Sequence, residues 1–186
     1  MTRKRTIGIL TVLTAAAASV FALTQGKLSA EQPAPPTITP TETVMANQPC
    51  AYTWAYKDLP EISAEFEASV KAALPEANAH ALAFGEDCVA ADGSSTFLAM
   101  ETDFYVILSV TDLDDYELLG NFIEQVLPIV DGFAPPHVPG PKEGFVEFTF
   151  RNGENQRVLR VPLSLGRELR ERGLHGAELI AAIESQ

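Results

Sequence analysis

The chain carries few side chains that could do chemistry, and their spacing matches no strong catalytic motif. It contains 3 histidines and 2 cysteines. The G-x-S-x-G, H-E-x-x-H, P-loop and G-x-G-x-x-G patterns, which position nucleophiles, zinc ions or phosphates, do not occur in it. A histidine-based site therefore has few options. We expect no cofactor and no metal ion, and we favour a non-catalytic protein over an enzyme.

Two histidines, His80 and His137, are candidate ligand-binding residues. His80 lies on an expected strand, on the same face as Leu82 and Phe84. It is either a ligand or base, or a half-buried sheet histidine, and without a partner motif we favour the second interpretation. His137 lies in a long proline-rich loop, a kind of segment that often carries function. His175 precedes an expected helix and is interpreted as a helix-start residue.

Asp112, Asp114 and Asp115 resemble the opening of a calcium-binding loop. The resemblance ends at Tyr116 and Glu117, which stand where such a loop needs an oxygen ligand and a glycine. Acidic residues are also expected in the first turn of a helix, where they interact favourably with the helix dipole. We therefore favour a helix start over a metal site.

Acidic residues on the strands leave a second functional hypothesis open, a small extracytoplasmic hydrolase or other enzyme whose site no motif describes. It requires Glu101 or Asp103 to lie near His80 on a neighbouring strand, where the groups could act as acid and base. The hypothesis fails if these side chains point to opposite faces of the sheet.

The most suggestive feature is a row of aromatic residues, Tyr52, Trp54 and Tyr56, which alternate along an expected strand and so share one of its faces. Aromatic side chains are enriched at interfaces and in ligand clefts. The row is therefore a candidate ligand-binding surface if it lies on an open face of the sheet. We expect it to be core instead, because a central strand must fill the space beneath Phe66 and Phe122.

The two cysteines, Cys50 and Cys88, predict a disulfide, because an even number in an exported chain is typical of one. In the chain-entropy picture a bridge over this separation stabilises the fold by roughly 3 to 4 kcal/mol. Free thiols or a metal site are the alternatives. The pair lacks the C-x-x-C spacing of metal ligands, which favours the disulfide.

The elements that must position these residues follow from hydrophobic periodicity and turn signals. They run strand, helix, strand, strand, helix, strand, and then strand, helix, helix. Asp58 is predicted to cap the first helix, and Asp112 with Asp115 the second. The expected strands span residues 50–56, 78–86, 97–110, 145–151 and 157–163, and the last helix spans 176–184.

The first six elements match the split βαβ, or ferredoxin-like, arrangement of α+β domains. Its sheet order, 4-1-3-2, places the apolar third strand at the centre, and a C-terminal hairpin strand extends the sheet beside the fourth. The start of the first strand and the end of the second lie at the same end of such a sheet. This arrangement brings Cys50 and Cys88 together and supports both predictions.

The N-terminal residues have the pattern of an export signal, a basic cluster at Arg3–Arg5 followed by an uncharged stretch from Thr6 to Gly26. The stretch is also long enough to remain as an uncleaved anchor, although its alanines favour cleavage. Residues 31–49 are rich in proline and threonine and predict a flexible tether. We thus expect an export signal or signal anchor at 1–30, this tether, and a single domain at 50–186.

Acidic charge limits the classes of partner. The net charge is −12, and nucleic acids and anionic membrane surfaces both require a positive footprint. We expect no nucleic-acid partner, and membrane contact only through the N-terminal segment if it stays uncleaved. Of the basic residues, six are arginines between Arg151 and Arg172, either a docking patch for an acidic partner or an ordinary solvated face.

These observations favour an exported, non-catalytic binding or interaction module. We expect it to act at the cell envelope or outside it, secreted or tethered to the outer face of the cytoplasmic membrane. Its partner, a protein or a small ligand, stays open at this point.

Overall fold

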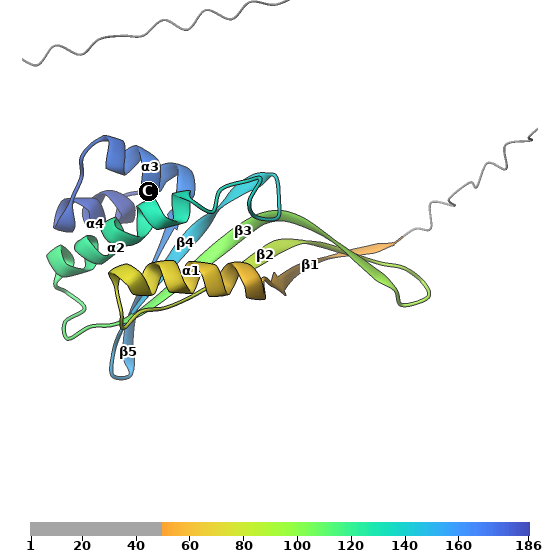
Figure 1. Cartoon of the computed structure of the whole chain (residues 1–186), viewed down its shortest axis with the longest axis horizontal. Helices are drawn as coiled ribbons and strands as arrows, with labels where there is room; N and C mark the ends of the chain where they lie inside the picture. Colours follow the sequence, from red (N-terminus) through yellow and green to blue (C-terminus); the bar gives the residue numbers. More distant parts are fainter. Residues whose placement is uncertain (1–49) are drawn as a thin grey trace, which may run out of the picture. The chain divides into compact units, whose positions relative to one another are not determined.

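The structure, a computed structural model, describes residues 50–186, so the predicted export signal and tether at 1–49 lie outside the described residues. The described part is an α+β domain whose elements follow the predicted order (Figure 1). Its sheet has five strands, and four helices accompany it. The elements are β1 Ala51–Asp58, α1 Pro60–Ala73, β2 Asn78–Val89, β3 Ser95–Ser109, α2 Tyr116–Asp131, β4 Lys142–Asn152, β5 Asn155–Pro162, α3 Leu163–Glu171 and α4 Gly176–Glu184.

The strands lie in the order β1-β2-β3-β4-β5. β3 and β4 are parallel, joined through α2, and every other neighbouring pair is antiparallel. The apolar β3 is central and β5 lies beside β4, as predicted. The ferredoxin-like order 4-1-3-2 is wrong, because β1 lies at an edge rather than between β3 and β4.

The edge position of β1 follows from its side chains. A strand in the middle of a sheet covered by helices must present large apolar groups to them. On the face that β1 shares with the helix-facing alanines of β2, it offers only Ala51, Thr53, Ala55 and Lys57. These residues cannot fill a core, and an edge strand does not need to.

The helices cover one face of the sheet. β2 places Ala79, Ala81 and Ala83 on that face, and all three are buried. Such small side chains let α1 lie close to the strand. The hydroxyl of Ser63 on α1 donates to the carbonyl oxygen of Ala81 (3.1 Å) and accepts from its N–H (3.0 Å). Ser63 thus satisfies the β2 backbone just beyond the last pair with β1, Asp58 opposite Leu82.

The core lies between this face and the helices. Phe104 and Phe66 meet edge to face with their ring centroids 4.9 Å apart, which joins β3 to α1. Phe148 and Phe150 of β4 are fully buried as well. The apolar stripe of α2 closes the core through Leu119, Ile123, Val126, Leu127 and Val130.

Of the predicted helix caps, Asp115 is confirmed and Asp58 is wrong. The Asp115 carboxylate accepts from the Leu118 N–H at 3.0 Å. Asp58 is instead the last residue of β1, and α1 begins at Pro60 after Leu59 with no side-chain cap. Proline at the first helical position has no N–H, so α1 begins with one unsatisfied donor fewer than an ordinary helix.

The predicted disulfide between Cys50 and Cys88 is confirmed, with the two Cα atoms 5.2 Å apart. It ties the residue before β1 to the end of β2, where the β2–β3 hairpin extends beyond the helices (Figure 1). Disulfides are typical of oxidising compartments outside the cytoplasm. Within residues 50–186, no helix combines the length and the hydropathy that a membrane crossing requires.

Replacing both cysteines, Cys50→Ser with Cys88→Ser, should lower the free energy of unfolding by about 3 to 4 kcal/mol, because the unfolded chain regains its loop entropy. Urea unfolding of the oxidised protein and of the variant measures the difference. Wild-type protein unfolded in reductant is the control and should match the variant. Equal midpoints for the oxidised protein and the variant would contradict a stabilising role for the bridge.

Candidate functional site

The sheet face opposite the helices carries the aromatic row of β1. Tyr52, Trp54 and Tyr56 are 67%, 63% and 55% exposed. The expectation that this row is core is therefore wrong. It rested on a central β1, whereas the even-numbered residues of the edge strand β1 point away from the helices. The row belongs to a surface, which is the arrangement that a binding site requires.

Phe84 of β2 supports the row from the side. It lies directly opposite Tyr56 in the strand register. The ring centroids of Trp54 and Phe84 are 5.4 Å apart and stacked, and those of Tyr56 and Phe84 are 5.0 Å apart. These contacts hold the rings of Trp54 and Tyr56 in place while leaving more than half of each side chain in water.

The aromatic surface continues across the sheet. His80 stacks on Tyr105 with a centroid distance of 4.8 Å, and Tyr105 meets Phe145 edge to face at 5.9 Å. The Arg160 guanidinium lies 4.1 Å from the centre of the Phe145 ring. We call this surface the aromatic face; its members are Tyr52, Trp54, Tyr56, His80, Phe84, Tyr105 and Phe145. His80 is half-buried in it, as the favoured interpretation of this residue predicts.

Beneath the aromatic face lies Asp103, a carboxylate with no exposed surface. Its Oδ1 accepts from the Phe145 N–H at 3.3 Å, and its Oδ2 has no hydrogen-bond partner among the described residues. Burial raises the pKa of Asp103 to about 6. A Cβ on Gly144 would come within 2.3 Å of Asp103 Oδ1, so only glycine fits beside this carboxylate.

The sequence did not single out Asp103 as a buried acid. The available signal was its place in the middle of an apolar strand, between Thr102 and Phe104, with Gly144 on the following strand. An acid in a strand that is apolar on both faces must be either paired or protonated. Recognising this one required the β3–β4 register, whose irregularity at Asp103 brings Gly144 and Phe145 opposite it.

The register tests the geometric condition of the enzyme hypothesis. His80 pairs with Tyr105, Leu82 with Asp103, and Phe84 with Glu101. His80, Asp103 and Glu101 therefore lie on the same face, as that hypothesis requires. However, Asp103 has no exposed surface. His80 is half-buried and stacks on Tyr105.

The remaining candidate residues lie apart from the aromatic face. His137 is exposed in the loop between α2 and β4. His175 is the N-cap residue of α4, as predicted, and its Nδ1 lies 2.8 Å from Glu124 Oε1. The Asp112 carboxylate accepts from the Asp114 N–H at 2.8 Å. Among residues 50–186 no group of His, Cys, Asp or Glu side chains is arranged to hold a metal ion.

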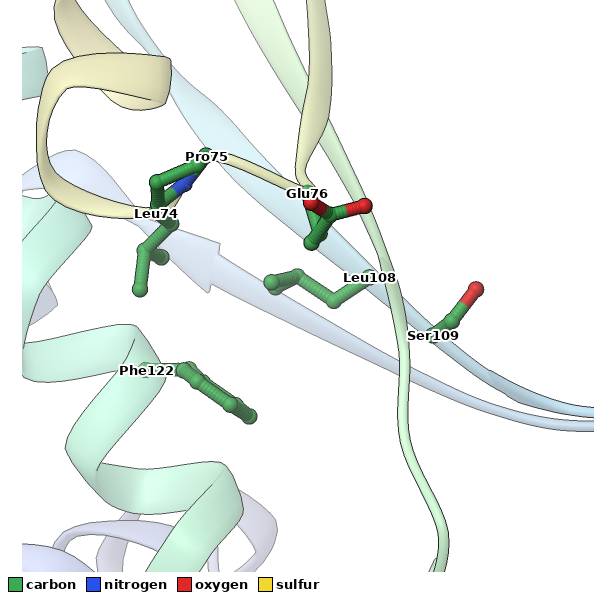
Figure 2. A pocket seen from close by; sticks show the side chains of 6 residues that line it. All are labelled: Leu74, Pro75, Glu76, Leu108, Ser109 and Phe122. Atoms are coloured by element: carbon green, nitrogen blue, oxygen red, sulfur yellow. The ribbon is translucent and has the colours of Figure 1, made fainter.

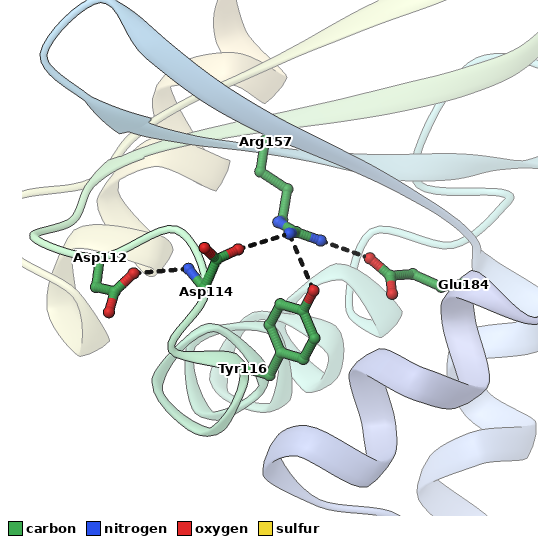
Figure 3. Close-up of polar contacts among 5 residues, drawn as sticks. All are labelled: Asp112, Asp114, Tyr116, Arg157 and Glu184. Carbon is green, nitrogen blue, oxygen red and sulfur yellow. Dashed lines mark hydrogen bonds and ion pairs between the residues drawn. The ribbon is translucent and has the colours of Figure 1, made fainter.

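The arginine-rich segment makes its contacts within the domain. Arg157 of β5 joins the start of α2 to the end of α4 (Figure 3). Its guanidinium donates to Asp114 (3.1 Å), Glu184 (2.7 Å) and the Tyr116 hydroxyl (3.1 Å). Arg160 pairs with Glu147, and Arg167 and Arg170 both pair with Asp131. The charge of these arginines is thus compensated internally.

Three hollows show what else the surface offers. One lies between the α1–β2 connection, α2 and β3, has a volume of about 220 Å³, and is mainly apolar with the single carboxylate of Glu76 (Figure 2). A polar hollow of about 330 Å³ lies over the paired residues Asp131, Arg167 and Arg170. A smaller hollow of about 130 Å³ adjoins the aromatic row and is lined by Tyr52, Thr53, Trp54 and Glu86. Only the last contains predicted site residues.

Comparisons with known proteins give no match to a family model, to a curated protein or to a solved structure. The aromatic face is therefore interpreted from its own geometry.

Replacing Asp103 with asparagine should change the pH dependence of stability. The folded pKa of about 6 lies above the ordinary value of 3.8, so the folded state binds more protons between these values and loses stability as pH rises through them. Asp103→Asn should therefore be more stable than wild type by on the order of 3 kcal/mol at pH 7.5, and about equal to it at pH 4.

Urea unfolding of both proteins from pH 4 to 8 measures this difference. Glu65→Gln, at an exposed position of α1, is the control and should stay within about 0.5 kcal/mol of wild type throughout. Parallel stability curves for wild type and Asp103→Asn would show that the buried carboxyl does not titrate as inferred.

Removing the charge of Arg157 should destabilise the domain, because three partners on two other segments lose their donor. We expect Arg157→Gln to lower the free energy of unfolding by about 1 to 2 kcal/mol. Arg151→Gln on the same hairpin is the matched control, since Arg151 is exposed and has no ion pair among the described residues; it should change stability by less than about 0.5 kcal/mol. Equal effects of the two substitutions would argue against the bridging role of Arg157.

Proposed function

We propose that this protein is an exported, non-catalytic binding module and that the aromatic face of its sheet is the binding surface. The observation that carries the proposal is the exposure of Tyr52, Trp54 and Tyr56 side by side on one edge strand. Large aromatic side chains are usually at least half-buried in a monomer. A row of three in water is costly unless a partner covers it.

The energetics of the row suit binding. Covering apolar surface contributes about 25 cal/mol per Å², and aromatic side chains have only two rotatable bonds to order. Trp54 and Tyr56 are already held against Phe84. A partner that covers them therefore gains apolar contact at a small entropic cost.

Two features support a location outside the cytoplasm. The Cys50–Cys88 disulfide suits an oxidising compartment. The basic cluster and apolar stretch at residues 3–26 have the pattern of an export signal. The acidic domain would then face partners at the cell envelope or beyond it.

A catalytic role finds less support. The raised pKa of Asp103 is the kind of perturbation that active sites show. A catalytic group must nevertheless reach its substrate, and Asp103 lies under the aromatic face with no exposed atom. We interpret it as a structural acid that meets the backbone of Phe145.

The proposal is tested by affinity capture from the native organism with the oxidised full chain as bait. The triple variant Tyr52→Ser, Trp54→Ser, Tyr56→Ser should retain at least tenfold less of the principal partner, because central aromatic residues each contribute about 2 kcal/mol or more at interfaces. The double variant Glu168→Ser, Arg172→Ser, an exposed ion pair at the end of α3, is the control and should capture like wild type.

A small ligand would be found with the same bait in solution. Trp54 is the only tryptophan of the chain, so its emission should move to shorter wavelength when a low-mass fraction of the extract covers it. Two results together would exclude the aromatic face as the binding surface: capture by the triple variant equal to that of wild type, and no change in the Trp54 emission of the wild-type protein when extract is added.

A further inference from the structure

We propose that the free edge of β1 binds an extended peptide with lysine or arginine at alternate positions, which adds to the sheet as a sixth strand. This inference rests on the proposed function and names the partner of the same surface. Peptides that add to a sheet edge gain affinity from main-chain hydrogen bonds and specificity from alternate side chains.

The outer edge of β1 is open to such a peptide. β1 has no strand partner on that side among residues 50–186, and all of its residues except Ala55 are exposed. Alternate residues of an edge strand direct unpaired N–H and C=O groups outward. Edges are usually protected by charge or proline, but β1 contains no proline and is charged only at Lys57 and Asp58.

The opposite edge of the sheet, β5, has features that prevent the addition of a further strand. β5 carries Arg157 and Arg160 in its middle and ends at Pro162. The helices α3 and α4 also contact it. The two edges therefore differ in the features that prevent strand addition, and β1 is the unprotected one.

β1 is also anchored to β2 along its length before any peptide arrives. The disulfide fixes its start, and Lys57 Nζ lies 3.8 Å from Asp87 Oδ1 near its end. Trp54 and Tyr56 pack on Phe84 between these points. Because β1 is already ordered, it loses less conformational entropy when a peptide binds.

The spacing of the aromatic row matches an added strand. Side chains on one face of any strand repeat every two residues, about 6.6 to 6.8 Å. Alternate side chains of a paired peptide therefore fall in step with Tyr52, Trp54 and Tyr56. Cross-strand neighbours are about 4.5 to 5.5 Å apart at Cβ, within reach of an aromatic ring.

Contacts inside the domain indicate that these side chains are cationic. Three half-buried rings of the domain lie under its own cations: Phe145 under Arg160 at 4.1 Å, Phe97 under Lys57 at 4.6 Å, and Tyr116 under Arg157 at 4.7 Å. Arg160 lies on the edge strand β5, next to the strand of Phe145, and it also pairs with Glu147 at 2.7 Å. The row on β1 has no described cation over it.

The charge around β1 completes the match. The hollow lined by Tyr52, Thr53, Trp54 and Glu86, of about 130 Å³, combines aromatic walls with a carboxylate, the pair of groups that holds an ammonium or guanidinium. From Cys50 to Glu101 the only cations are Lys57 and Lys71, and both are paired with acids. Asp58, Glu86 and Glu101 are left without a described cation, so this end of the sheet attracts basic chains.

The test uses the oxidised full chain and an eight-residue peptide that alternates lysine and threonine. Trp54 emission should move to shorter wavelength on titration, with an affinity at least tenfold higher than for a lysine–proline repeat, which has the same charge but lacks alternate N–H groups. A glutamate–threonine repeat should bind at least tenfold more weakly as well. Measured by labelled-peptide anisotropy, Glu86→Gln should weaken binding several-fold, whereas Glu171→Gln on α3 should not.

Each result decides between strand addition and another mode. Equal binding of the lysine–proline peptide would overturn the inference in favour of general electrostatic attraction. Concentration-dependent dimerisation that the Tyr52→Ser, Trp54→Ser, Tyr56→Ser variant abolishes, without peptide binding, would assign the edge to a second copy of the chain. Absence of peptide binding while native extract still shifts Trp54 would overturn the basic-peptide inference alone and leave the proposed function intact.

Discussion

Close packing of α1 on the alanines of β2 is the contact on which the rest of the structure depends. Ala79, Ala81 and Ala83 let the helix lie so close to β2 that no large side chain would fit between them. The Ser63 hydroxyl bonds both the N–H and the carbonyl oxygen of Ala81. The large residues of β2 must then take the other face, because successive side chains of a strand alternate. His80, Leu82 and Phe84 thus lie on the side without helices, and the aromatic face is built on them.

The same packing determines what β1 can be. Its own helix-side residues are small or polar, so it adds nothing to the core and lies at the edge. What holds it there is the open-face contact of Trp54 and Tyr56 with Phe84, together with the disulfide at its start. The residues that stabilise β1 and the residues that form the candidate binding surface are therefore the same, which explains why such exposed rings remain ordered.

Element order and the disulfide could be predicted from the sequence, whereas the sheet order could not. Turn signals, proline positions and periodicity are local, and they located each strand and helix. The placement of β1 depends on which faces are covered, a property of the assembled sheet. The alternation of alanine with Leu82 and Phe84 contained the relevant information, since alanines at every second position indicate a close helix. The helix-side residues of β1 are small or polar as well. This pattern predicts that Tyr52, Trp54 and Tyr56 lie on the exposed face rather than in the core.

The burial of Asp103 could not be predicted from local sequence patterns either. Its neighbours in the sequence are those of a buried strand, and nothing nearby in the chain is basic. The group that meets it, the backbone N–H of Phe145, comes from a strand 42 residues away, and space for it exists because position 144 is glycine. Burial removes water from the Asp103 carboxylate, and this desolvation raises its pKa. Asp103 shares its strand face with Tyr105 and lies opposite Leu82, so the buried acid and the exposed rings lie on the same side of the sheet.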